Sequence, residues 1–252
     1  RETAVATRAD RKRRLPICAM PPGDDALAHV ANMAGRGAAV AWIRNSVDDA
    51  IEAAESLRAR GIEPVLLHAR FAMGDRLRIE ERVRNTLGKS ETGESRGGFV
   101  VVGTQILQES LDYDVDVMVT DLAPIDLVIQ RAGRLWRHTD RKGRPVKVPE
   151  LVVVMPDWKD VKDQDWYRQV SRRGGAVYTH HGVVWRTAKT LSEAGAIETP
   201  GGVRHLIESV YRRGDEDNDD VPAPLQRASN SAVGDHMAQM AIANGYLLDV
   251  RS

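Results

Sequence analysis

The stretch FVVVGTQILQESLDYDVDVMVTDLAPIDLVIQRAGRLWRH, residues 99–138, decides the fold. It opens with a short apolar run that ends at Gly103, passes through a polar and acidic turn, and enters a second apolar run at residues 116–121. A helical pattern with arginines on one side follows. Continuous apolar runs rich in Val are typical of strands that are buried on both faces of a sheet. The stretch therefore predicts a strand, a ligand-facing loop, a second strand and a helix.

Similar apolar runs occur on either side of this stretch. AAVAWI (38–43) and PVLLHA (64–69) precede it, and LVVVM (151–155) follows it. Together with the first two, these runs predict five buried strands.

Two helical segments separate the earlier runs. NSVDDAIEAAESLRARG has Ser46 as a candidate N-cap and Gly61 as a stop signal. MGDRLRIEERVRNTLGK places Leu77, Val83 and Leu87 at helical spacing. Alternating strands and helices predict an α/β fold with a mostly parallel sheet flanked by helices. In such folds the functional site lies beyond the carboxyl ends of the strands.

The arginines near the end of the opening stretch are the main functional signal. If residues 130–138 are helical, Gln130, Arg134 and Arg137 lie on one face and apolar side chains occupy the other. Arg134 has no acid three or four residues away, and Arg137 has only Asp140. We therefore expect two unpaired guanidinium groups, which suit an anion such as a phosphoryl group.

Composition limits the classes of protein to consider. The chain has 252 residues, 42% of them hydrophobic, with 36 basic and 36 acidic side chains, so net charge gives no argument for nucleic acid or a membrane surface. The single cysteine excludes an internal disulfide and fits a cytoplasmic location. No apolar run is long enough to cross a membrane, so we expect no membrane partner. Because the chain begins without Met, we expect it to be a piece of a longer polypeptide.

The alternation of predicted strands and helices ends after the last apolar run. Helical segments are predicted at 161–172, 177–194 and 203–212, with no further strand, and an acidic stretch and another helix at 225–243 follow. We therefore divide the chain into four parts: a basic linker (1–14), the α/β domain (15–158), a helical extension (159–212), and an acidic linker with a helix leading to a C-terminal region (213–252).

Two apparent motifs, a phosphate-binding loop and a histidine metal site, lack residues that they require. Gly88, Lys89 and Ser90 resemble the end of a phosphate-binding P-loop, but Val83 stands where the motif requires glycine, and a helix precedes it where the motif needs a strand. No DExH or DExD box is present. The pair His180 and His181 lacks an acid or a third histidine at ligand spacing, so we predict no metal site.

The opening stretch resembles motifs V and VI of superfamily 2 helicases. Motif VI runs Q/H-R-x-G-R-x-x-R and is matched by Gln130, Arg131, Gly133, Arg134 and Arg137. Within that superfamily, TDLAPID followed by IQRAGR is most similar to the CRISPR-associated helicase–nuclease of type I systems. The likeness covers residues 38–155 and continues more weakly beyond them. It implies a RecA-like fold, namely the second of the two helicase lobes.

The resemblance implies roles for particular residues in ATP hydrolysis. Arg134 and Arg137 would contact the γ-phosphate of ATP, with Arg137 as the arginine finger, and Gln130 would belong to the same polar rim. Asp112 would accept hydrogen bonds from the ribose. The cofactor would be ATP with Mg2+, and the missing first lobe would hold the phosphates and the metal.

It also implies contacts with single-stranded DNA. Thr104 and Gln105 would touch the DNA backbone, where hydroxyl and amide groups bind without reading sequence. The stretches RNSVDDA and LLHARFAMGDR, which contain Asn45, His68 and Arg70, resemble the family's motif IV region and its histidine-containing strand end. They are further candidates for the DNA-facing surface, with a structural role as the alternative for each.

The implied protein is larger than this chain. Its other parts would be a first RecA-like lobe and a nuclease domain, and its partner would be a crRNA-guided surveillance complex (Cascade). We expect the chain alone to be inactive as an ATPase and to contain no nuclease site. Two alternatives stay open: the second lobe of another superfamily 2 DNA or RNA helicase, and a RecA-like binding module that does not hydrolyse ATP.

Overall fold

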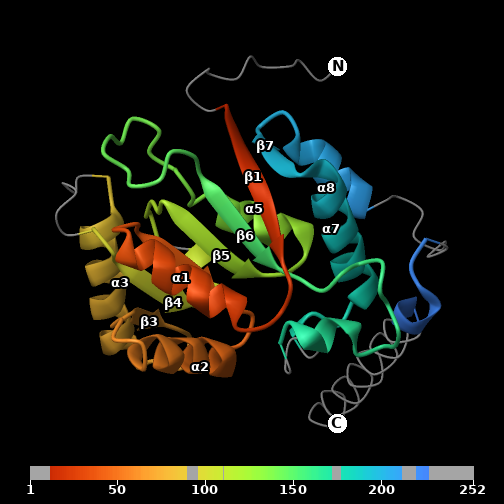
Figure 1. Ribbon diagram of the computed structural model, residues 1–252, viewed down its shortest axis with the longest axis horizontal. Coiled ribbons are helices and arrows are strands. Elements are labelled where there is room, and N and C mark those ends of the chain that lie inside the picture. The colour runs from red at the N-terminus through yellow and green to blue at the C-terminus, as the bar shows by residue number, and fades with distance from the viewer. Residues whose placement is uncertain (1–11, 90–95, 110, 172–176, 212–219, 227–252) are drawn as a thin grey trace, which may run out of the picture.

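A seven-stranded sheet in the order β3-β4-β2-β5-β6-β1-β7 forms the centre of the molecule (Figure 1). The computed structural model describes residues 12–89, 96–109, 111–171, 177–211 and 220–226. The strands are β1 (Arg13–Met20), β2 (Val40–Ile43), β3 (Val65–Leu67), β4 (Val100–Gly103), β5 (Val117–Asp121), β6 (Glu150–Val154) and β7 (Ala196–Thr199). All five strands expected from the apolar runs are present. Strands β1 to β6 pair in parallel, which confirms the predicted α/β class.

Two strands were not expected. β7 pairs antiparallel with β1, with Leu15 opposite Ile197, so the prediction that no strand follows the last apolar run is wrong. Only two residues of β7 are buried, and so short a run gives no sequence signal. β1 begins at Arg13, inside the segment expected to be a linker, and the remainder of that segment, residues 1–11, lies outside the described residues.

Helices flank the sheet. They are α1 (Asp25–Gly35), α2 (Val47–Arg58), α3 (Met73–Leu87), α4 (Ile106–Glu109), α5 (Ile125–Ala132), the short 3-10 helix η2 (Trp166–Gln169), α7 (His181–Ala194) and α8 (Val203–Val210). The helix expected at 161–172 is reduced to η2, whereas α7 and α8 match the other two predicted helices of the extension. Most of the helix expected at 225–243 lies outside the described residues.

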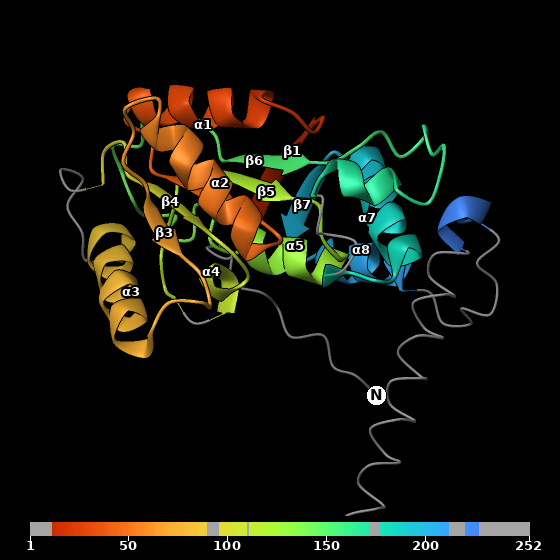
Figure 2. The ribbon, with the colours of Figure 1, turned by 90° about the horizontal axis from the view of Figure 1, so that it is seen from below.

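Each face of the sheet has its own apolar core. In β2, Val40 and Trp42 pack with α1 and α2, whereas Ala41 and Ile43 belong to the cluster formed with α3, α5 and α7. Figure 2 shows α1 above the sheet and α5 below it. Since successive side chains of a strand point to opposite faces, burial on both sides explains why the strands are continuous apolar runs.

Local signals fix the ends of the elements that matter for the site. The Ser46 hydroxyl accepts a hydrogen bond from the Asp49 amide at 3.1 Å and so caps α2, as predicted. At the end of β4, a Cβ on Gly103 would lie 2.4 Å from the Leu67 carbonyl oxygen, so the loop after β4 requires glycine there. Leu77, expected on the buried face of α3, is 54% exposed.

Candidate functional site

Three predicted site residues meet at the carboxyl edge of the sheet. Asn45, His68 and Thr104 follow β2, β3 and β4, and the Thr104 amide donates to the last carbonyl of β3 at 3.3 Å. Gln105 is half-buried and its Nε2 donates to the Asn45 carbonyl oxygen at 3.2 Å. Arg70 is exposed and pairs with Asp48 at 2.6 Å. We call His68, Arg70, Thr104 and Gln105 the strand-end rim; Arg70 is exposed, Gln105 is half-buried, and His68 and Thr104 are buried.

Asn45 lies beneath this rim rather than on its surface. It is 2% exposed, and its Nδ2 donates to the Leu122 carbonyl oxygen at 2.7 Å and to the Tyr167 hydroxyl at 2.8 Å. Its Oδ1 accepts a hydrogen bond from Arg131 at 3.2 Å. Both ends of the amide are therefore bound by protein, and Asn45 supports the loop instead of projecting from it.

Arg131 is the centre of the polar network below the rim. Its side chain is fully buried and donates to Gln108 Oε1 at 2.9 Å, Thr120 Oγ1 at 2.7 Å and the Asp121 carbonyl oxygen at 3.0 Å. A further bond of 3.2 Å joins it to the Tyr178 hydroxyl. This one side chain thus links α5 to α4, to the end of β5 and to the chain beyond η2.

The network includes residues that sequence reasoning missed. Tyr167 and Tyr178 come from the extension after β6, far from the motifs in sequence, and no local pattern marks them. Burial raises the pKa of Tyr167 well above its usual value, so its hydroxyl stays protonated and donates to the Leu122 carbonyl oxygen at 2.6 Å. Arg44 was also missed, and its Nε contacts both carboxylate oxygens of buried Asp121 at 3.0 and 3.1 Å.

The arginines of the opening stretch do not lie on a helix, so that prediction is wrong. α5 ends at Ala132, and Arg134 and Arg137 are in the loop that follows. The chain turns there because it pairs with the residues before β5: the Val115 amide donates to the Arg134 carbonyl oxygen at 3.2 Å, and the Trp136 amide donates to the Val115 carbonyl oxygen at 3.0 Å. Trp136 adopts a positive φ of 47° to permit this pairing.

Further contacts hold in place the loop after α5 that carries Arg134 and Arg137, which we call the arginine loop. The Trp136 indole donates to the Asp116 carbonyl oxygen at 3.1 Å, and the His138 amide donates to Asp114 Oδ1 at 3.3 Å. Arg13, in β1, donates to the loop's backbone oxygens at 3.0 and 3.2 Å. The residues on both sides of Arg137 are therefore anchored, which fixes its position without a helix.

Arg137 is not unpaired. Its Nε lies 2.5 Å from Asp112 Oδ1, and the two side chains are 41% and 58% exposed. The expectation of an unpaired guanidinium group at Arg137 is therefore wrong, because Asp112 is distant in sequence and close in space. Two residues predicted to contact the same nucleotide are in contact with each other.

Arg134 lies beside this pair and is half-buried. Its Nη2 donates to the Gln108 carbonyl oxygen at 2.9 Å, and its guanidinium lies 5.9 Å from the centre of the Tyr113 ring. Among the described residues, its Nε has no hydrogen-bond partner. Burial and the charge of Arg137 lower the pKa of Arg134, so an anion beside it would be stabilised. Gln130 is exposed at the end of α5. We call Asp112, Gln130, Arg134 and Arg137 the arginine rim.

The fold and these two rims together define the class of protein domain to which the chain corresponds. A parallel sheet with polar strand-end loops and an exposed Asp and two Arg, in a chain without a phosphate-binding loop, is the second RecA-like lobe of a superfamily 2 helicase.

Comparison with known proteins identifies the family. Residues 36–140 match the family model for the C-terminal part of the CRISPR-associated nuclease/helicase Cas3. The CRISPR-associated endonuclease/helicase Cas3 of Escherichia coli (strain K12) is 33% identical over 205 residues, which are 78% of this chain and 22% of that protein. These matches confirm the resemblance found in the sequence: the chain is related to the Cas3 nuclease/helicases.

Solved structures agree with the family and the fold. The crystal structure of T. fusca Cas3-ATP is similar with a TM-score of 0.74 and 28% identity, and the match covers 96% of this chain and 28% of that chain. A chain of a CRISPR RNA-guided surveillance complex, pre-nicking, is similar with a TM-score of 0.71 and 27% identity over 92% of this chain and 28% of that chain. The chain thus spans less than a third of the length of these relatives.

The described residues offer neither a membrane span nor a metal site. None of their helices combines the length and apolar character needed to cross a membrane. No three His, Cys, Asp or Glu side chains among them are arranged to hold a metal ion.

Proposed function

We propose that this chain is the second lobe of an ATP-driven translocase on single-stranded DNA that acts in type I CRISPR interference. The observation that supports this most strongly is the arginine rim, in which Asp112, Arg134 and Arg137 meet at one exposed place although they come from two separate motifs. Such a rim needs a nucleotide whose phosphates are held elsewhere, and the sequence has no P-loop of its own.

The geometry of the arginine rim suits a nucleotide that arrives from a facing lobe. The Asp112–Arg137 pair is exposed, and such pairs contribute only about 0–1 kcal/mol, so ATP can replace it at little cost. Asp112 would then accept hydrogen bonds from the ribose. Arg137 would turn to the γ-phosphate as the arginine finger, with half-buried Arg134 contributing its positive charge beside it.

The remaining requirements of the reaction fall to other parts of the protein. Mg2+ would accompany the nucleotide, and carboxylates of the preceding lobe would hold it. Gln130 lies at the end of α5 beside the arginine loop and would contribute a polar contact to the same nucleotide. The chain alone is then half of an ATPase site.

The strand-end rim would contact the DNA backbone. Gln105 and Thr104 lie at the loop after β4, and exposed Arg70 adds a positive charge beside His68. Asn45 enters this proposal as a support, because its carbonyl oxygen holds Gln105 and its amide is bound by Arg131. Lobe closure on ATP would move these contacts relative to those of the first lobe, and opening after hydrolysis would complete a step along the strand.

The relatives support the partners that we propose. The likeness to a Cas3 structure with ATP favours ATP as the nucleotide, and the likeness to a chain in a CRISPR RNA-guided surveillance complex favours such a complex as the recruiting partner. The nuclease activity would belong to a part of the protein beyond this chain.

The test is ATP hydrolysis in the presence of single-stranded DNA, measured for this chain alone and for a protein in which the preceding lobe is restored. We expect no turnover by the chain alone and DNA-stimulated turnover by the longer protein. Turnover by the chain alone would mean that it contains a complete nucleotide site and would refute the half-site proposal.

A further inference from the structure

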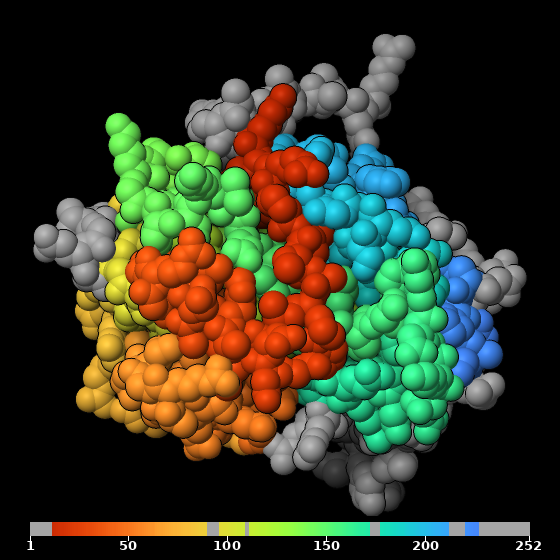
Figure 3. Space-filling view, in the orientation of Figure 1, coloured from red at the N-terminus to blue at the C-terminus, as the bar shows by residue number. Residues whose placement is uncertain are grey.

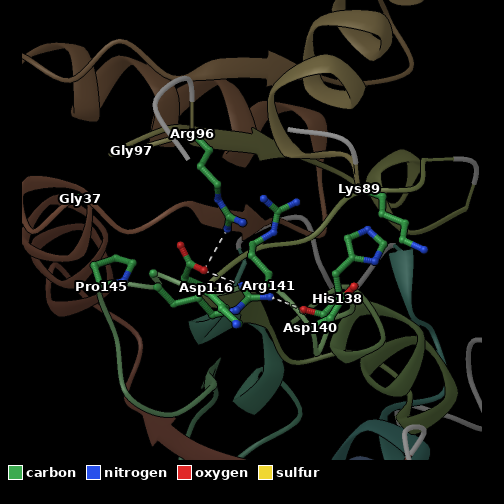
Figure 4. Close-up of a pocket in the computed structure, with 12 residues that line it drawn as sticks. Gly37, Lys89, Arg96, Gly97, Asp116, His138, Asp140, Arg141 and Pro145 are labelled. Carbon is green, nitrogen blue, oxygen red and sulfur yellow. Dashed lines mark hydrogen bonds and ion pairs between the residues drawn. The ribbon is translucent and has the colours of Figure 1, made fainter. Parts of the chain in front are cut away.

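A pocket lies at the edge of the sheet opposite to the strand-end rim. Gly37 precedes β2, Arg96 precedes β4 and Asp116 precedes β5, so the pocket is at the amino ends of the parallel strands (Figure 4). The loop between α5 and β6, green at the upper left of Figure 1 and of the surface in Figure 3, supplies its other side. The cavity measures about 370 Å³, within the range of small-ligand sites.

The floor of the pocket is an ionic cluster with more arginines than acids. Asp114 and Asp116 are buried, at 0% and 2% exposure. Arg96 contacts them at 3.2 and 2.9 Å, and Arg144 contacts them at 2.9 and 2.6 Å. Arg141 lies 2.8 Å from Asp114. Among the described residues, two carboxylates therefore face three guanidinium groups, so the summed charge of these five side chains is positive.

The rest of the pocket adds to this charge. Lys89 and Lys142 are exposed at its mouth, and Asp140 is the additional acid. The described residues of the site thus supply five cationic side chains against three carboxylates. Burial lowers the pKa of Arg96. The carboxylates of Asp116 and Asp114 oppose this shift, and the charges of Arg141 and Arg144 add to it, so the net direction is downward.

The chemistry of the lining favours phosphate. Guanidinium groups present planar forks of donors that match phosphate oxygens. Gly37 and Gly143 both have positive φ, and a Cβ added to either would meet no atom within 4 Å, so the walls leave room for a tetrahedral group. No Phe, Tyr or Trp side chain lines the pocket among the described residues, whereas sites for single-stranded nucleic acid stack bases on aromatic rings.

We propose that this pocket binds a small phosphate-bearing anion, such as inorganic phosphate or the phosphate of a mononucleotide, at a site separate from the arginine rim. Arg141 and Arg144 would share the anion with their present carboxylate partners, and Lys89 and Lys142 would attract it at the mouth. Because Asp114 also holds the amide of His138, next to Arg137, the two sites are neighbours and must be separated by experiment.

The test is calorimetric titration of the folded chain with inorganic phosphate at low salt. We expect saturable binding that Lys89→Glu or Lys142→Glu each weakens about fivefold, the effect of reversing one unit charge about 8 Å from an anion in a water-like dielectric. Lys147→Glu is the matched control, because it makes the same charge change in the same loop outside the pocket. Arg137→Ala tests the arginine rim separately.

Each outcome decides the proposal. Binding that Lys142→Glu weakens, and that Lys147→Glu and Arg137→Ala leave unchanged, supports it. Three results would overturn it: no saturable binding, equal weakening by Lys147→Glu, or loss of binding in Arg137→Ala alone, which would place the anion at the arginine rim. A short single-stranded oligonucleotide that binds through Lys142 when phosphate does not bind would also overturn it in favour of a nucleic-acid surface.

Discussion

Replacing Arg131 with Met tests the network that places the strand-end rim. Met keeps most of the side chain's apolar volume but removes the charge and every donor. Two buried acceptors, Asn45 Oδ1 and Gln108 Oε1, would lose the hydrogen bond that Arg131 donates, whereas the Asp121 carbonyl oxygen would keep its bond from the Thr120 hydroxyl. Each unsatisfied buried acceptor costs about 1–3 kcal/mol, or about 4 kcal/mol for the two.

The loss is smaller than this sum because the variant no longer buries a guanidinium group, whose desolvation costs several kcal/mol. We therefore expect Arg131→Met to lower the free energy of unfolding by about 2 kcal/mol. The assay is urea denaturation of the chain followed by circular dichroism. Gln130→Met, the same replacement at the exposed neighbouring position, should change stability by less than about 0.5 kcal/mol. A loss of less than about 1 kcal/mol for Arg131→Met would refute the reasoning.

Three further predictions follow from other parts of the structure. Gly103→Ala should destabilise the chain by about 2 kcal/mol or more in the same denaturation assay, because the new methyl group would overlap the Leu67 carbonyl oxygen; an unchanged midpoint would contradict this. Asp112→Asn, in the protein with its preceding lobe, should raise the KM for ATP about tenfold, because the carboxylate would no longer accept hydrogen bonds from the ribose hydroxyls. The variant should also lose any preference for ATP over its dideoxyribose analogue, and a retained preference would exclude the ribose contact. Burial lowers the pKa of both His68 and His138 below the usual 6.5, so the unfolded chain binds protons before the folded chain does. The free energy of unfolding should therefore fall as the pH drops below about 6.5. Replacing both histidines with Gln should flatten this dependence on pH, and an unchanged slope would rule out these two groups as its cause.

The sheet could be predicted because its strands are buried on both faces. That burial demands continuous apolar runs, and all five expected runs form parallel strands. β1 and β7 could not be found in the same way, since β1 is mostly half-buried or exposed and β7 buries only two residues. Their pairing depends on contacts between residues about 180 positions apart.

The motifs located the site, but helical periodicity gave the wrong geometry for the arginines. The pattern of apolar residues after Gln130 fits a helix, yet the chain leaves the helix at Gly133 because pairing with Val115 satisfies the backbone instead. The Asp112–Arg137 pair and the bonds of Tyr178 are long-range contacts that no local spacing encodes. Sequence therefore predicted which residue types gather here better than how they are held.

The most direct test of the central claim is the rate of ATP hydrolysis by Arg137→Ala in the protein that includes the preceding lobe, with single-stranded DNA at saturation. Removing an arginine finger costs about a thousandfold or more in kcat, and we expect that loss with little change in DNA affinity. Arg204→Ala, which removes another arginine from an exposed ion pair outside the arginine rim, is the matched control and should hydrolyse ATP at the unmodified rate. A large loss confined to Arg137→Ala supports the composite ATPase site, and equal turnover by Arg137→Ala and the unmodified protein would contradict it.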